Sequence, residues 1–426
     1  MVGLIAFGPG SYVPSVLARG TQIGTVSLAT IQGAQLSLNP PNATNIIGPT
    51  ILRLSNGEYR MYFQARDSNG YANIMSATST DGLRWTYDSG VRVLHGPTPS
   101  SIDWEAGEPD VIQGFNGTYF MPYTGRQQIP GAPTGAFFHK VVFASSQDSL
   151  GWAKGNYNFS DPSQTGGFTS SADVIKVNGA YEMYYTGCCQ TISGIFRAQS
   201  TDFVHWQTMG RIFEVGHDSS TIEVNGTYYM FLMAPPSFTP ATPMNQDVLF
   251  LAVSSDGINW SNEVYRAVLT NSSSGETINT STLGDPADMV AQNGNLIVYL
   301  NGPMGSSIFG TEPVSSLPKA PAQTTSTITT GAPGASTSTS STTTTPNTPT
   351  VGSTSTSSPT ASASTGSSTP SGESTSSTTL NTSTSIPEFP YQILVALVVT
   401  FAVVASYLVF RRHTRGPGGH VVPSQN

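Results

Sequence analysis

The chain has 426 residues, of which only 10% are charged, and its formal net charge is −8. No basic patch accompanies this acidic balance, so the composition argues against nucleic-acid binding. Residues 318–386 are almost wholly Ser, Thr, Pro, Gly and Ala, with too little apolar surface to offset the entropy of ordering. We therefore expect a disordered stalk there and one folded domain at 21–317, which is long enough for a sizeable core.

The N-terminal segment 1–20 lacks the basic start of an export signal, and its apolar run is broken at Gly8-Pro9-Gly10. We interpret it as a poorly defined N-terminus, with an export remnant as the alternative. The next segment, Thr21 to Leu38, has Val, Leu and Ile at near-alternate positions. This alternation predicts a β-strand.

A phrase of Asn-Gly followed by an aromatic residue and Met recurs along the chain. Asn-Gly between two apolar runs predicts a β-hairpin, because both central positions of a type I′ turn have positive φ. Five such hairpins at a long period predict an all-β fold, a five-bladed β-propeller. The copies begin at Asn56, Asn116, Asn178, Asn225 and, in a weaker form, Asn293.

A second phrase follows each of the first four hairpins: an apolar start, small residues, an Asp and then a Trp. We interpret each Asp as a structural turn former before the outer strand of a blade. These residues are Asp81, Asp148, Asp202 and Asp256. The fifth copy is truncated at Ile308 to Thr311, and we expect Thr21 to Leu38 to supply its missing strand and so to remove the open edges.

Acidic residues recur where the innermost strand of each blade meets the central channel. Closely spaced carboxylates raise one another's proton affinity, so that one stays protonated while another is ionised. Glycosidic cleavage needs this division of roles. Counting back from each Asn-Gly places Thr50, Asp110, Asp173, Ser220 and Asp288 at the channel mouth. We predict that Asp110, Asp173 and Asp288 are catalytic; the alternative for each Asp is capping of backbone amides.

Four further charged residues are expected on the same face and are predicted to bind the substrate. Glu108 and Asp218 neighbour the acidic positions, whereas Arg66 and Arg126 lie in the loops after the second strand of a blade. As an alternative, the two arginines neutralise Asp110 in a structural ion pair.

Three aromatic residues are candidates for stacking on a sugar, namely Trp104, Tyr123 and Tyr185. Because the two tyrosines repeat at a fixed register, the blade core is the favoured interpretation for them.

The blade phrases, in particular Ser254 to Trp260 and Asn225 to Met230, resemble those of five-bladed glycoside hydrolases over roughly 45–311. These are the arabinanase and β-xylosidase group (family 43) and the invertase and levansucrase group (families 32 and 68). The resemblance implies a propeller that acts on an oligo- or polysaccharide. It also implies an Asp base in blade one, an Asp in blade three and a Glu acid in blade four.

The catalytic pattern of that family is only partly present. Asp173 matches blade three, but Thr50 stands where the blade-one Asp is expected, and His217 to Ser220 replace a Glu-Gly-Pro-like segment. Starting the pattern from blade five instead selects Asp288, Asp110 and Asp173. A carbohydrate-active enzyme and a catalytically silent propeller that binds a glycan or a protein both remain open, with a structural envelope component as a third hypothesis.

The sequence predicts no cofactor. His139, His205 and His217 have no metal-ligand spacing, although a structural calcium ion in the channel is left open. The two cysteines, Cys188 and Cys189, are adjacent, and both a vicinal disulfide and free thiols are compatible with the sequence.

The C-terminal part contains an uninterrupted apolar run from Ile393 to Phe410. Its length predicts a transmembrane helix at 391–410. The basic tail at 411–426 is expected in the cytoplasm, and the propeller and stalk outside the cell, on a single-pass protein of the cell membrane. The lead-in Ile386-Pro387-Glu388-Phe389-Pro390 resembles the C-terminal anchors of archaeal surface proteins.

Overall fold

The computed structural model describes residues 21–36, 43, 45–133, 135–162, 167–187, 193–238, 247–302, 307–314 and 316–320. Their regular structure is β-strand apart from one short 3-10 helix, η2 (Thr280–Thr282), so the predicted all-β class is confirmed. Within these residues no helix is long and apolar enough to cross a membrane. The expected N-terminal remnant, the membrane segment, the tail, both cysteines and nearly all of the stalk lie outside them.

The strands pair into four sheets. The first sheet contains β2 (Ile46–Arg53), β3 (Tyr59–Arg66), β4 (Ala72–Ser79) and β5 (Thr86–Tyr87). The second contains β6 (Glu105–Gly107), β7 (Ile112–Gln113), β8 (Tyr119–Gln128), β9 (Phe137–Ser146) and β10 (Ala153–Phe159). The third contains β11 (Thr169–Val177), β12 (Ala180–Gly187), β13 (Gly194–Ser200) and β14 (Gln207–Phe213).

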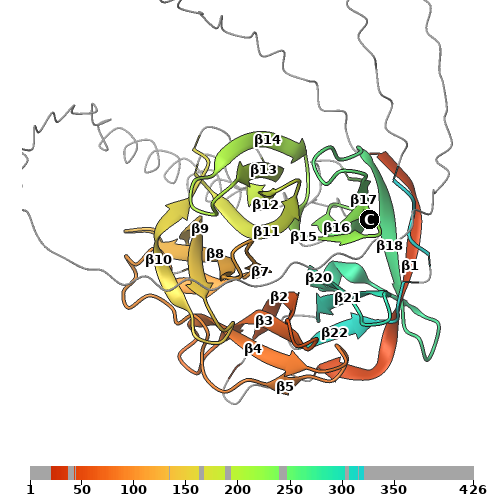
Figure 1. Cartoon of the computed structure of the whole chain (residues 1–426), viewed down its shortest axis with the longest axis horizontal. Coiled ribbons are helices and arrows are strands. Elements are labelled where there is room, and N and C mark those ends of the chain that lie inside the picture. The colour runs from red at the N-terminus through yellow and green to blue at the C-terminus, as the bar shows by residue number, and fades with distance from the viewer. Residues whose placement is uncertain are drawn as a thin grey trace, which may run out of the picture. The chain divides into compact units, whose positions relative to one another are not determined.

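The fourth sheet has nine strands, eight of which form two groups. One group is β15 (His217–Val224), β16 (Thr227–Ala234), β17 (Val248–Ser254) and β18 (Glu263–Thr270), with the short β19 (Thr277–Ile278) beside β18. The other is β20 (Gly284–Val290), β21 (Leu296–Asn301) and β22 (Ile308–Thr311). The first strand of each repeat is its innermost strand and lies toward a common centre (Figure 1). At this centre β2 and β15 contact β20, and β11 contacts β15.

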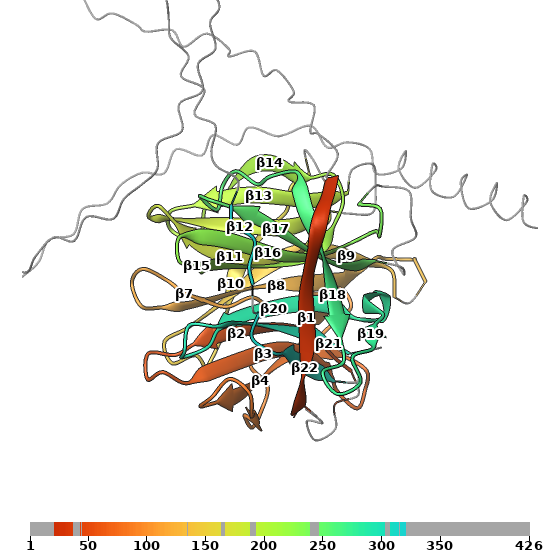
Figure 2. The same ribbon diagram turned by 90° about the vertical axis from the view of Figure 1, so that its right-hand side faces the viewer.

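The N-terminal strand β1 (Thr21–Leu36) joins the two groups of the fourth sheet. Its second half pairs antiparallel with β22, which confirms that the N-terminal segment completes the truncated last repeat. Its first half pairs parallel with β18, from Thr21 opposite Glu263 to Ala29 opposite Thr270, and the sequence did not predict this contact. Figure 2 shows β1 as a long strand alongside β18.

The Asn-Gly hairpins are of two kinds. Asn178 and Asn225 have φ values of 50° and 53° and precede glycines that also have positive φ, as the predicted type I′ turn requires. At the other three hairpins only the glycine has positive φ, so the type I′ prediction is wrong there. Their loops are one residue longer and place the glycine after a tight turn, closed for example by a 2.9 Å hydrogen bond from Gly57 N to Leu54 O.

The Asp turns are structural, as predicted. Asp81 Oδ1 accepts backbone hydrogen bonds from Leu83 and Arg84, both at 2.8 Å. Ser79 donates to the same oxygen at 3.0 Å and accepts from the Gly82 N–H. The same arrangement repeats at Asp148, Asp202 and Asp256.

Apolar side chains fill the spaces between neighbouring sheets. Met61 and Phe63 of β3, for example, share a buried cluster with Met289 of β20 and Tyr299 of β21. The strand β1 contributes Val26 and Leu28 to another cluster, with Leu251 of β17 among its members. Closure through β1 is therefore a packing contact as well as a hydrogen-bonded one.

Truncation of Leu28 tests this closure. Because Leu28 is only 2% exposed, Leu28→Ala is expected to lower the free energy of unfolding by about 2 to 5 kcal/mol. Ile23→Ala on the same strand is the control, since Ile23 is 45% exposed and should change stability by less than about 1 kcal/mol. Urea denaturation followed by tryptophan fluorescence measures both; equal effects would contradict a buried closing strand.

Candidate functional site

Near the beginning of each innermost strand, or between β6 and β7 in the second sheet, one residue lies in the left-handed region of backbone space. The five residues are Gly48 (φ 59°), Glu108 (46°), Ser171 (47°), Asp218 (48°) and Asp285 (40°). In β2, β11, β15 and β20, pairing with the second strand is interrupted at this residue and the one after it. Such a conformation costs of order 1–3 kcal/mol for a residue other than glycine, and residues of this kind concentrate at functional sites.

At Gly48 the left-handed conformation coincides with a close approach. A Cβ atom there would lie 3.1 Å from Glu108 Cα, so a side chain at this position would meet the backbone of the next segment. The other four positions carry polar side chains instead, three of them carboxylates.

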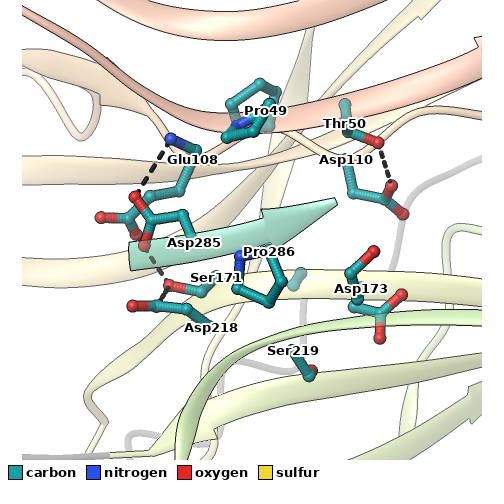
Figure 3. A pocket seen from close by; sticks show the side chains of 14 residues that line it. Pro49, Thr50, Glu108, Asp110, Ser171, Asp173, Asp218, Ser219, Asp285 and Pro286 are labelled. Carbon is teal, nitrogen blue, oxygen red and sulfur yellow. Dashed lines mark hydrogen bonds between the residues drawn. The ribbon is translucent and has the colours of Figure 1, made fainter. Parts of the chain in front are cut away.

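These five residues, together with those that follow each of them, line a small cavity of about 40 Å³ at the centre of the sheets (Figure 3). Thr50, Asp110, Asp173 and Ser220 also line a second cavity of about 270 Å³, together with Asp288. The predicted channel-mouth residues are thus brought together around one central space, with the left-handed residues in a separate layer.

A chain of hydrogen bonds links the left-handed residues of all five strands. The Ser171 hydroxyl lies 2.9 Å from Glu108 Oε2 and 2.6 Å from Asp218 Oδ1. A hydrogen bond connects Asp218 with Asp285, and Asp285 Oδ2 accepts from the Gly48 N–H at 3.0 Å. Three carboxylates from distant parts of the sequence therefore converge on one layer of the cavity.

The histidine beside Asp218 determines the charge of this layer. His217 Nδ1 lies 2.6 Å from Asp218 Oδ2, and Nε2 lies 2.7 Å from Asp247 Oδ2. Burial lowers the pKa of His217, but the two carboxylates outweigh it and raise that pKa well above the usual value. His217 is therefore an imidazolium clamped between two acids.

The two hydrogen-bonded acids have pKa values shifted in opposite directions. Burial raises the pKa of Asp218, but the charge of His217 and its hydrogen bond outweigh burial and lower that pKa below the usual range. Burial, and then the negative charge of Asp218, raise the pKa of Asp285 well above its usual value. These opposite shifts favour a proton on Asp285 and an ionised Asp218, and this division of roles characterises acid–base pairs.

The predicted catalytic residues form the second layer. Asp110 accepts from Thr50 Oγ1 and from the Val174 N–H, both at 2.8 Å. Asp173 accepts from the Thr221 N–H at 3.2 Å and from its hydroxyl at 2.6 Å. Each carboxylate thus ties its own strand to a neighbouring one, as the capping alternative requires.

Asp288 differs from the other two acids of this layer. It is only 8% exposed, it is hydrogen-bonded to Ser220, and its Oδ2 atom has no partner among the described residues. Burial, together with the charge of Asp110, raises the pKa of Asp288 to about 8. Burial likewise raises the pKa values of Asp110 and Asp173.

The predicted arginines pair with glutamates and not with Asp110. Arg126 binds Glu108 and donates to Gln64 Oε1 at 2.9 Å. Arg66 forms two hydrogen bonds with Glu105, at 2.8 and 2.9 Å. The ion-pair alternative with Asp110 is therefore not supported, and Arg126 instead contacts the left-handed layer directly.

Of the predicted stacking residues, the two tyrosines belong to the core. Tyr123 is 1% exposed and Tyr185 is fully buried, which confirms the favoured interpretation. Trp104 is partly exposed and contacts the rings of Tyr71 and His95. Among the described residues, no group of three or more His, Cys, Asp or Glu is arranged to hold a metal ion.

Sequence reasoning assigned no catalytic or binding role to Asp285, and considered His217 only as a metal ligand. One signal for the left-handed layer was present: Pro follows the left-handed residue at Gly48, Glu108 and Asp285. The partner Asp247 carried no such signal, since it lies on a loop far from His217 in the sequence.

Comparison with known proteins supports the fold. No protein-family model matches the sequence, and no curated protein is similar to it. A solved glycosyl hydrolase from Bacteroides ovatus matches with a TM-score of 0.50 and 14% identity, over 68% of this chain and 95% of its own. Also similar is a structure of GH130-family glycoside hydrolases that target β-1,2 mannosidic linkages, with a TM-score of 0.49 and 13% identity over 70% of this chain and 98% of its own. A thermostable family-43 glycoside hydrolase matches with a TM-score of 0.44 and 17% identity, over 67% of this chain and 99% of its own. At 14% identity, the likeness to the Bacteroides ovatus structure indicates a shared fold and not an activity.

The buried Asp288 gives the stability of the protein a testable pH dependence. Below about pH 4 its carboxyl is protonated in both the folded and the unfolded chain. As pH rises toward the folded pKa of about 8, only the unfolded chain loses the proton, so the free energy of unfolding decreases.

Asp288→Asn removes this titration. The loss of unfolding free energy between pH 5 and pH 8, measured by urea denaturation, is therefore expected to be smaller in the variant by roughly 1 kcal/mol or more, because one pKa unit corresponds to about 1.4 kcal/mol. Superimposable pH dependences in the two proteins would show that Asp288 is not held protonated.

Proposed function

We propose that the domain is a carbohydrate-active enzyme that hydrolyses glycosidic bonds at the left-handed layer of the central cavity. One observation carries the proposal: Asp218 and Asp285 are hydrogen-bonded to each other and have pKa values shifted in opposite directions. Glycosidic cleavage requires one protonated and one ionised carboxyl beside the same bond. The match to a solved glycosyl hydrolase fold is consistent with this chemistry.

In the proposed reaction the glycosidic oxygen replaces Asp218 as the partner of the proton on Asp285. Asp285 donates that proton to the leaving group, and a water that attacks the anomeric carbon gives its proton to Asp218. Imidazolium His217 keeps Asp218 ionised before the reaction. Glu108 shares the Ser171 hydroxyl with Asp218 and is proposed to contact the sugar together with Arg126.

The layer formed by Asp110, Asp173 and Asp288 is the alternative catalytic set. Its acids are close enough for Asp110 and Asp288 both to raise the pKa of Asp173. Hydrogen bonds to neighbouring strands occupy Asp110 and Asp173, however, and this favours a structural role for them. We therefore assign the chemistry to the left-handed layer.

A glycan-binding protein without catalysis is the second candidate. The direct hydrogen bond between Asp218 and Asp285 favours it, because inverting glycosidases separate their carboxyl groups by about 6.5–9.5 Å to admit a water. Hydrolysis therefore requires the bound sugar to part the two acids, whereas binding alone does not.

We propose a five-bladed propeller as the architecture. Five left-handed residues on five innermost segments support this count, and so does the division of the nine-stranded sheet into two groups joined through β1. We further propose that the propeller is displayed outside the cell on the stalk at 318–386, with the apolar run at 391–410 as its membrane anchor. The composition of these segments supports that arrangement.

Two neutral variants distinguish the catalytic sets. Asp285→Asn is expected to lower hydrolysis at least about 100-fold, because the amide has no acidic proton to donate. Asp288→Asn, in the second layer, is expected to retain activity. The assay is release of reducing sugar from arabinan, xylan, fructan and mannan oligosaccharides. Loss of activity in the Asp288 variant alone would move the chemistry to the second layer, and binding without turnover in the unmodified protein would favour the second candidate.

Replacement of His217 tests how Asp218 is kept ionised. Without the imidazolium the pKa of Asp218 rises, so His217→Gln is expected to shift the acidic limb of the kcat/KM profile upward by about one pH unit or more. His205→Gln is a matched control, because the His205 side chain is 87% exposed and pairs with the turn residue Asp202, away from the cavity-lining residues. An unchanged pH profile in the His217 variant would contradict this role.

A further inference from the structure

A third hollow lies beside the ion pair of Arg66 and Glu105, and the mechanism proposed above does not use it. Its volume is about 710 Å³, within the range of small-molecule sites. Three loops form it: the turn between β3 and β4, the segment leading into β6, and the connection between β8 and β9. We call this hollow the aromatic groove, after Tyr71, Trp104 and Phe137, which line it.

A cluster of aromatic rings forms one side of the aromatic groove. Trp104 and Tyr71 have ring centroids 4.7 Å apart at 64°, and Tyr71 and His95 lie 4.6 Å apart at 30°. Tyr71, Trp104 and Phe137 are all partly exposed. They are therefore accessible to a ligand, unlike Tyr123 and Tyr185, which are buried in the core. Amphipathic rings of this kind offer an apolar surface while their polar edges remain hydrated.

The polar groups of the groove are few and already neutralised. Glu105 is only 7% exposed, and both of its oxygens accept hydrogen bonds from Arg66. Asn69 and Gln128 add neutral amides to the lining. A site with apolar rings, amides and a compensated ion pair favours a neutral ligand that is rich in hydroxyl groups and has apolar ring faces.

One ion-pair network connects the aromatic groove with the candidate active site. Glu105, which lines the groove, lies 3.9 Å from Arg126 Nη1. The other terminal nitrogen of Arg126 binds Glu108, which lines the central cavity with Asp218 and Asp285. Two arginine–glutamate contacts therefore connect the groove with the central cavity, and the Ser171 hydroxyl continues the connection from Glu108 to Asp218.

We propose that the aromatic groove is a distal sugar subsite, which holds a neutral saccharide unit of an oligosaccharide whose reacting bond lies at Asp285. The proposal rests on the assignment of the central cavity as the site of sugar chemistry. It adds that the ligand is a chain and extends over the first and second sheets. It also explains why Trp104 stands in a loop beside an ion pair instead of in a blade core.

The test compares short and long ligands in the full chain. Isothermal titration measures binding of disaccharides and pentasaccharides of the arabinan, xylan, fructan and mannan series to Asp285→Asn protein, so that turnover does not interfere. Trp104→Ala in this background is expected to weaken pentasaccharide binding about tenfold, since stacking surfaces dominate such contacts. It should change disaccharide binding less than about twofold.

Two further variants make the result specific. Trp104→Phe keeps an aromatic face and should restore most of the pentasaccharide affinity, which separates loss of stacking from loss of folding. Phe115→Ala removes an aromatic side chain that is 54% exposed on the hairpin between β7 and β8, and it should leave both affinities unchanged.

Different experimental results would refute the distal subsite and the proposed hydrolysis. An equal loss for both ligand lengths, no loss, or no binding of any series to the Asp285→Asn protein would each overturn the distal subsite. Hydrolysis of disaccharides without any preference for length would overturn the subsite and leave the catalytic assignment intact. Length-dependent binding that needs Trp104, without turnover in the unmodified protein, would support the subsite and refute hydrolysis.

Discussion

The left-handed residue near the beginning of each innermost segment is the constraint on which the site depends. In β2, β11, β15 and β20 it interrupts the pairing with the second strand, and in all five segments this residue lines the same layer of the cavity. The strain at these positions is offset by the hydrogen bonds from Ser171 and Gly48 that join them.

The proton distribution follows from that geometry. Asp218 and Asp285 share a hydrogen bond, and the charge of His217, which contacts Asp218 and Asp247, favours the ionised form of Asp218. Asp247 lies outside the layer but completes the clamp on the imidazole ring. His217 and Asp247, which do not line the central cavity, therefore influence the charge of Asp218, which does.

Much of the fold could be predicted from the sequence, because its signals are local. The turns at Asp81 and its equivalents need only hydrogen bonds within a few residues, and they form as the pattern indicates.

The register at the centre depends instead on loop geometry. The hairpin at Asn293 has a loop one residue longer than the hairpin at Asn178. Ala287 lies opposite Tyr299 and is therefore the structural equivalent of Asp173, which lies opposite Tyr184. Asp288 lies as far before Asn293 as Asp173 lies before Asn178, so sequence spacing indicates Asp288, one position after the true equivalent. The pairing of β1 with β18 and the clamp by Asp247 join residues far apart in the chain, and no local pattern encodes them.

The route by which the polypeptide leaves the domain has a mechanical consequence. After β22 the backbone of Glu312 donates to Ala29 O on β1, Val314 donates to Leu296 O on β21, and Pro318 O accepts from the Tyr229 hydroxyl on β16. Tension applied through the downstream chain would thus be shared among three strands rather than unzipping the last one from its end. A domain held by a tether at this point would resist unfolding by force, because the hydrogen bond between Glu312 and β1 would have to break together with the other contacts.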